Sequence, residues 1–201
     1  MKTIKDLKKS ILMVALMTAS LSYANNTSSF IVTKDIKKTA LILEHVKKGE
    51  LISIKNNSGL ILYKEIIKSS GTYSKGFDLT ELPDGNYFFE LDGDVEIKTI
   101  PFLVKANNVV FDRTKETILF KPTTRLKGNL ILVSKLALDF EPLKIDLYYK
   151  GISGSFELIN SETIDNTKFI ERIYKLSDDY KGNYKIVYNT SGKEFTEYIN
   201  F

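Results

Sequence analysis

The sequence predicts an all-β protein made of two β-sandwiches in tandem. One observation is an internal repeat, because Gly85-Asn86-Tyr87 recurs 97 residues later as Gly182-Asn183-Tyr184. Another is the succession of short runs rich in Ile, Leu, Val, Tyr and Phe, separated by Gly, Asn, Asp and Ser. Such runs are typical of strands joined by turns. Beyond residue 24, no segment keeps an apolar stripe at helical spacing for three turns.

Residues 1–24 have the pattern of a secretory signal peptide. Four lysines precede residue 10, an apolar run extends from Ile11 to Ala19, and Ser22-Tyr23-Ala24 ends the segment. The small residues predict cleavage between Ala24 and Asn25. The apolar run is too short for a membrane span, which needs about 20 residues. We therefore expect export to the periplasm, cell surface or medium, with no transmembrane segment in the mature chain.

The mature chain divides into a first sandwich at 25–105 and a second at 106–201, with about seven strands each, as suits a β-sandwich. The strands expected in the first sandwich are 29–33, 40–46, 51–55, 60–66, 75–79, 86–91 and 95–104. Those expected in the second are 117–121, 129–138, 144–150, 155–159, 168–176, 183–189 and 194–200. Pro101 lacks a backbone N–H, so its strand is expected at a sheet edge or kinked.

Alternation after each Gly-Asn pair predicts which side chains are buried. In the second copy Tyr184 and Tyr188 share one face of a strand, and Lys185 and Asn189 share the other. The first copy alternates in the same way from Tyr87. Alternation of this kind buries one face of a sheet and leaves the other in water.

The repeated glycines and tyrosines are predicted to be structural. Gly85 and Gly182 occur where the chain must turn, and glycine takes positive φ there without steric cost. Tyr87 and Tyr184 each follow two residues later, near the start of a strand. That placement suits a tyrosine corner, in which the hydroxyl bonds to backbone upstream of its own strand.

Composition excludes several classes of function. The net charge is +4, but residues 1–24 hold four Lys and one Asp, which leaves the mature chain at +1. Lys and Glu alternate along it, whereas nucleic-acid binding needs a concentrated basic face. The absence of Cys excludes thiolate catalysis and Cys-ligated metal.

No catalytic constellation emerges from the motifs. His45 is the single His, and a catalytic base needs a matched partner; we expect a surface or half-buried strand residue. The run from Gly151 to Ser155 is a hairpin turn without the nucleophile-elbow spacing. Asp92-Gly93-Asp94 offers few of the oxygens that Ca²⁺ needs and is a favoured hairpin turn. We predict no enzyme, no cofactor and no metal site.

Two further groups of residues invite a functional interpretation. Glu65 and Glu162 match in the repeat, but paired glycosidase acids must share one cleft, so both are expected on solvated surface. The second copy is rich in tyrosine: Tyr148, Tyr149, Tyr174, Tyr180, Tyr184 and Tyr188. An exposed row would stack on sugars or a peptide, although most are expected in the core.

The segments from Leu51 to Glu65 and from Phe77 to Leu91 resemble the secretion-tail domains of type IX secretion cargo from Bacteroidota. The shared pattern is a strand, a Gly turn and a strand, followed by Asp-Leu and then Leu-Pro-x-Gly-x-Tyr. The resemblance covers about 55 residues and implies an immunoglobulin-like sandwich. The copy at 145–201 matches more loosely, and the chain end from Glu194 to Phe201 lacks a basic, valine-rich ending.

These observations favour an exported, non-enzymatic binding or scaffold protein of two tandem immunoglobulin-like sandwiches. The sequence does not identify its partner, for which a protein and a surface glycan are the two candidates. One alternative is type IX cargo with a C-terminal sorting-like domain, and another is a carbohydrate-binding accessory module.

Overall fold

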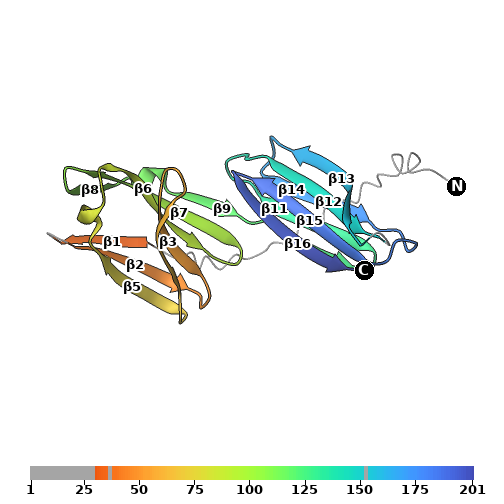
Figure 1. Ribbon diagram of the computed structural model, residues 1–201, viewed down its shortest axis with the longest axis horizontal. Helices are drawn as coiled ribbons and strands as arrows, with labels where there is room; N and C mark the ends of the chain where they lie inside the picture. The colour runs from red at the N-terminus through yellow and green to blue at the C-terminus, as the bar shows by residue number, and fades with distance from the viewer. Residues whose placement is uncertain (1–29, 36–37, 152–153) are drawn as a thin grey trace.

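The computed structural model describes residues 30–35, 38–151 and 154–201, and it is all-β over these residues, with two short 3-10 turns (Figure 1). The expected signal peptide, with Ala24 and Asn25, lies outside the described residues. Among the residues described, no helix has the length and apolar character needed to cross a membrane. The strands form two pairs of sheets, which follow one another along the longest axis of the molecule.

The first sheet pair is antiparallel throughout. Its smaller sheet has the order β1-β2-β5, from strands β1 (Phe30–Asp35), β2 (Lys38–Val46) and β5 (Gly71–Phe77). Its larger sheet has the order β4-β3-β6-β7-β8, from β4 (Ile61–Ile66), β3 (Leu51–Asn56), β6 (Gly85–Asp92), β7 (Glu96–Lys105) and β8 (Asn108–Phe111). Strand β9 (Thr117–Phe120) also pairs with β7. The 3-10 turns are η2 (Leu79–Glu81) and η3 (Arg113–Lys115).

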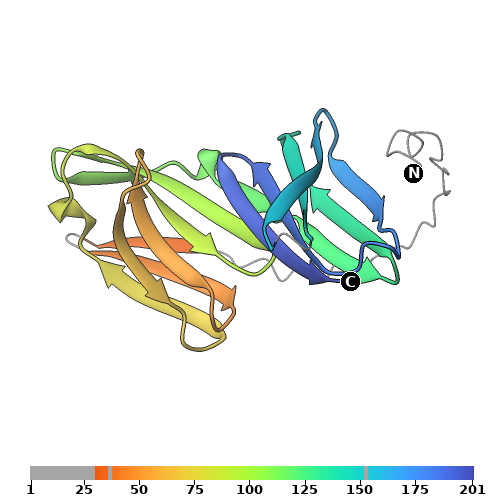
Figure 2. The ribbon, with the colours of Figure 1, turned by 45° about the vertical axis from the view of Figure 1, so that its right-hand side comes forward.

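The second sheet pair repeats this arrangement. Its smaller sheet has the order β10-β11-β14, from β10 (Thr123–Lys127), β11 (Leu130–Leu136) and β14 (Phe169–Lys175). Its larger sheet has the order β13-β12-β15-β16, from β13 (Phe156–Ile164), β12 (Leu143–Lys150), β15 (Asn183–Thr190) and β16 (Lys193–Asn200). Figure 2 shows β13 at the outer edge of its sheet.

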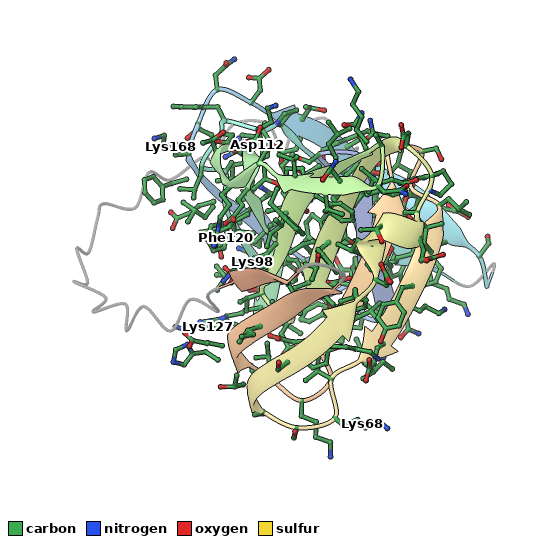
Figure 3. The ribbon with its side chains drawn as sticks, turned by 90° about the vertical axis from the view of Figure 1, so that its left-hand side faces the viewer. Lys68, Lys98, Asp112, Phe120, Lys127 and Lys168 are labelled. Atoms are coloured by element: carbon green, nitrogen blue, oxygen red, sulfur yellow. The ribbon has the colours of Figure 1, made fainter. Side chains whose placement is uncertain are left out.

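Each sheet pair encloses its own hydrophobic core. The first core joins Leu41 and Leu43 of β2 to Ile52 and Phe89 of the larger sheet, and side chains fill the space between these two sheets (Figure 3). Burying a side chain of this size contributes roughly 1.5–3 kcal/mol. The second core is a separate cluster drawn from β11, β12, β14 and β15. The inner face of each sheet therefore matches the alternation in the sequence.

The first sheet pair extends further along the chain than the sequence predicts. A boundary was expected between 105 and 106, but β8 and β9 lie beyond it and pair with β7. In the structure β9 is the last strand that pairs with the first sheet pair, and β10 is the first strand of the second. Strand β8 has only four residues, and β9 bonds to a strand more than ten residues away, so neither pairing is visible in local periodicity.

Pro101 lies in an internal strand rather than at an edge. Strand β7 pairs with β6 on one side, and on the other side it pairs with β9 at residues 96–99 and with β8 at residues 102–105. Pro101 occupies the gap between these two partners, and its carbonyl accepts from Asp112 N. The missing N–H of proline therefore falls where the pairing of β7 with β8 has already ended.

Both repeated tyrosines have the geometry of a tyrosine corner. The Tyr87 hydroxyl donates to Pro83 O at 2.8 Å, and the Tyr184 hydroxyl donates to Tyr180 O at 2.5 Å. The two glycines differ from each other. Gly182 has a φ of +149°, whereas Gly85 is not among the positive-φ residues, so the expected left-handed turn applies to the second copy alone.

A buried carboxylate joins the two sheet pairs. Glu90 of β6 is only 5% exposed. It accepts from Lys55 Nζ of β3 at 2.6 Å and from Lys193 Nζ, at the start of β16, at 2.8 Å. Burial alone would raise the pKa of Glu90, but the two ammonium groups outweigh burial and leave this pKa lowered. The β15–β16 turn is thereby fixed against the first sheet pair.

Replacing the corner hydroxyls will lower stability. We expect Tyr87→Phe and Tyr184→Phe each to reduce the free energy of unfolding by about 1 kcal/mol, the typical net worth of one hydrogen bond. Urea denaturation measures this change. Tyr180→Phe is the matched control, because the exposed Tyr180 hydroxyl has no hydrogen bond to any described residue. Unchanged stability in both corner variants would show that the hydroxyls are not structural.

Candidate functional site

The outer face of the sheet β13-β12-β15-β16 carries an aromatic–lysine face, which we define as Tyr148, Lys150, Phe156, Lys185 and Tyr198. Strand register brings these residues together. Lys150 pairs with Phe156, and Lys185 pairs with both Tyr148 and Tyr198. The five side chains therefore occupy two adjacent cross-strand rows. Tyr198 is 69% exposed, and Phe156 and Tyr148 are half-buried.

The rings of this face hold the ammonium groups of both lysines. Lys185 Nζ lies 4.3 Å from the ring centre of Tyr148 and 5.2 Å from that of Phe156. Lys150 Nζ lies 5.9 Å from the same Phe156 ring. Cations within about 6 Å of a ring centre are attracted by its quadrupole. Tyr198 packs 6.0 Å from Phe156, so the cluster is continuous from β13 to β16.

The two positive charges of this face are not neutralised by any described part of the chain. No described carboxylate lies within ion-pair distance of Lys150 or Lys185. The corresponding face of the first sheet pair differs, since Lys55 there is paired with Glu90 at 2.6 Å. The residue 97 positions after Glu90 is Val187, which is buried. The acid on the outer face of the second sheet pair lies on another strand, since Asp146 of β12 pairs in register with Val187 and forms an ion pair with Lys144 at 2.8 Å.

An open groove of about 420 Å³ borders the aromatic–lysine face, with Lys150, Phe156 and Tyr198 in its lining. This volume is within the range of small-molecule sites, about 300–1,000 Å³. Asn183 and Asn200 also line it, and Asn200 Nδ2 donates to Asn183 Oδ1 at 3.0 Å. Asn183 Nδ2 and Asn200 Oδ1 have no hydrogen bond to a described residue, so amide donors and an amide acceptor remain available at the groove.

The tyrosines of the second copy have several different environments. Tyr184 and Tyr188 are buried, and Tyr149 and Tyr174 pack against the same core. Burial raises the pKa of Tyr188 to about 12. Its hydroxyl forms a 2.6 Å hydrogen bond with the Thr124 hydroxyl of β10. Of the six tyrosines, only Tyr148 belongs to the aromatic–lysine face. Alternation in the sequence places Lys185 on an outer face, but the sequence does not single out Lys150, Phe156 or Tyr198.

The remaining sequence candidates stay apart. His45 is exposed and lies at an irregularity in the pairing of β2 with β5, with a φ of +59°. Asp92 ends β6, and its carboxylate pairs with Lys121 at 2.6 Å. Over the described residues, no three or more His, Cys, Asp or Glu side chains are grouped as metal ligands would be.

Glu65 and Glu162 are not the free surface residues that the sequence predicts. Glu65 of β4 accepts from Lys75 Nζ of β5 at 2.7 Å. Glu162 of β13 accepts from Arg172 Nε of β14 at 2.8 Å. Both cations also lie 97 residues apart. Each ion pair therefore bridges the two sheets of one sheet pair at the same edge, and the two glutamates never share a cleft.

Tyrosine hydroxyls strengthen both of these ion pairs. The Tyr63 and Tyr73 hydroxyls donate to the Glu65 carboxylate, and the Tyr174 hydroxyl donates to Glu162 at 2.6 Å. Hydrogen bonds from Lys75 and Tyr63 lower the pKa of Glu65 to about 2. Burial and the hydrogen bond to Glu162 raise the pKa of Tyr174. The ionised carboxylate is therefore the form that the fold stabilises.

Comparison with known proteins adds little to this geometry. No protein-family model matches the chain, and neither does any curated protein. Among solved structures, the human OSCAR ligand-binding domain aligns with 82% of this chain and 89% of its own, at 11% identity and a TM-score of 0.25. That score is too low to support an argument about fold or ligand. The resemblance to secretion-tail domains stays a hypothesis.

The Glu65 ion pair predicts a specific acid sensitivity. An unfolded glutamate has a pKa near 4.3, so between about pH 5 and pH 2 the unfolded chain takes up a proton that the folded chain does not. Stability from this group is complete above that window and is lost as the pH falls through it. The free energy of unfolding of the wild type should fall more steeply over this window than that of Glu65→Gln.

The control for this titration is Glu194→Gln, an exposed glutamate of β16 with no ion pair to a described residue. It should keep the wild-type slope. An equally steep decline in Glu65→Gln would mean that the ion pair does not stabilise the fold.

Proposed function

We propose that this chain is an exported, non-enzymatic binding or scaffold protein of two tandem immunoglobulin-like sandwiches, and that the aromatic–lysine face is its binding surface. The observation that carries the proposal is this face itself. Surface aromatics that are rigid and partly exposed are typical anchors of binding sites. Here three of them gather with two unneutralised lysines beside a groove.

Strand order supports the immunoglobulin-like assignment. In both sheet pairs the first, second and fifth strands form one sheet. The third, fourth, sixth and seventh strands form the other, in the order fourth-third-sixth-seventh. Immunoglobulin-like sandwiches likewise place the first, second and fifth strands in one sheet and the third, sixth and seventh in the other, with a tyrosine corner near the start of the sixth strand. Here the fourth strand joins the second of these sheets. Tyr87 and Tyr184 begin the sixth strands here.

The location of the face also supports a binding role. The β15–β16 turn, with Lys193, contacts the first sheet pair at Glu90. The aromatic–lysine face lies at the opposite end of the same two strands, where Asn183 pairs with Asn200. The contact between the sheet pairs therefore leaves this face open to a partner. Export is supported by the signal-peptide pattern of residues 1–24.

Removing the rings of this face should abolish partner binding. We expect the double variant Phe156→Ser, Tyr198→Ser of the mature protein to bind the cell envelope of its source at least tenfold more weakly than the wild type. Central aromatic anchors commonly carry this much of the binding energy. Sedimentation of the purified protein with envelope fragments measures the affinity.

The matched control is Phe169→Ser, Ile173→Ser, which removes apolar side chains that are 76% and 62% exposed on the outer face of β14. It should bind as the wild type does. If the two double variants bind equally, the aromatic–lysine face is not the binding surface. Thermal unfolding of each variant shows whether it is folded.

A further inference from the structure

We propose that the aromatic–lysine face binds an acidic polysaccharide, with Lys150 and Lys185 on its carboxylate groups. This inference rests on the proposed function, since it names the ligand class of the same face. It goes beyond the binding role because it specifies that the ligand is negatively charged and that it is a polysaccharide.

The charge requirement follows from the convergence of two cations on one ring. The ammonium groups of Lys150 and Lys185 lie 5.9 Å and 5.2 Å from the centre of Phe156. Neither ammonium group forms an ion pair with a described carboxylate. In the first sheet pair Glu90 supplies an anion to Lys55, whereas here Val187 stands 97 residues after Glu90. An anionic ligand supplies the counter-charge for Lys150 and Lys185.

The polar groups beside the lysines suit a ligand that also carries hydroxyls. Asn183 and Asn200 line the groove and keep both amide donors and an amide acceptor without a hydrogen bond to a described residue. A sugar hydroxyl both donates and accepts, so it satisfies the two together. Tyr198, the most exposed ring of the face, offers an apolar surface for a sugar ring. An acidic sugar presents the carboxylate, the hydroxyls and the apolar face at once.

The shape of the site favours a glycan over an acidic peptide. Peptides bind sheets most often by adding a strand at a free edge, where the main chain supplies the hydrogen bonds. The aromatic–lysine face spans all four strands of its sheet, from Phe156 on β13 to Tyr198 on β16. Its contacts therefore come from side chains across the sheet and not from one edge strand.

The test measures binding of the mature protein to three soluble polymers: polygalacturonate, its neutral methyl ester and poly-glutamate. Isothermal titration calorimetry compares the wild type with Lys150→Gln, Lys185→Gln. We expect the wild type to prefer polygalacturonate over the ester, with affinity falling as salt is added. The double variant should bind at least tenfold more weakly. The control variant is Lys127→Gln, Lys175→Gln, which removes the same charge from the other sheet's outer face and should bind as the wild type.

Each other outcome overturns the inference. Equal binding of the ester means that carboxylates are not recognised, and stronger binding of poly-glutamate assigns the face to an acidic peptide. Equal loss in the Lys127, Lys175 variant means that only net charge matters. If no polymer binds but the Phe156, Tyr198 variant loses envelope binding, the ligand class is wrong while the proposed function stands. If that variant keeps envelope binding, the proposed function itself fails.

Discussion

The strict alternation of side chains in the central strands constrains the rest of this structure. In β15 the inward residues Tyr184, Ile186 and Tyr188 are buried. Successive strand residues point to opposite faces. Because Tyr184 and Ile186 face the core, Lys185 must lie on the outer face. A shift of one residue would bury its charge and expose two tyrosines. The core therefore fixes both the register of the sheet and the position of Lys185.

The two halves of the chain share this framework but use their outer faces differently. In the first, Glu90 forms ion pairs with Lys55 and with Lys193 of the other half. The outer face of the first half therefore contacts the second half. In the second, the related residue is Val187, and Lys185 lies over the rings of Tyr148 and Phe156 without an ion pair to a described carboxylate. The ion pairs of Glu65 and Glu162, in contrast, are kept in both halves. Framework contacts are repeated, and surface chemistry is not.

The local periodicity of the sequence predicts most of the strands but not all of them. Each expected strand overlaps an observed one. Strands β8 and β10 are not expected, because β8 has four residues and β10 is largely polar, as Thr123–Lys127 shows. The assignment of 117–121 to the second half also differs, since β9 pairs with β7. Pairing with strands that are distant in the sequence determines where β8, β9 and β10 lie, and local periodicity does not reveal such pairing.

The candidate site was harder to predict than the fold. Alternation places Lys185 on an outer face, and the repeat identifies Glu65 and Glu162 as related residues. The partners of these residues come from strands that are distant in sequence: Phe156 reaches Lys185 across β12, whose pairing with β13 shifts between Leu147 and Tyr148. The sequence shows neither this shift nor the cross-sheet cations.

The most direct test of this account is lysine footprinting by mass spectrometry. The chain from residue 25 to residue 201 is acetylated briefly with and without polygalacturonate, and the extent of modification of each lysine is compared. The account predicts protection of Lys150 and Lys185, with unchanged labelling of Lys127 and Lys175 on the other sheet. Protection spread evenly over all lysines, or confined to a surface without Phe156 and Tyr198, would contradict it.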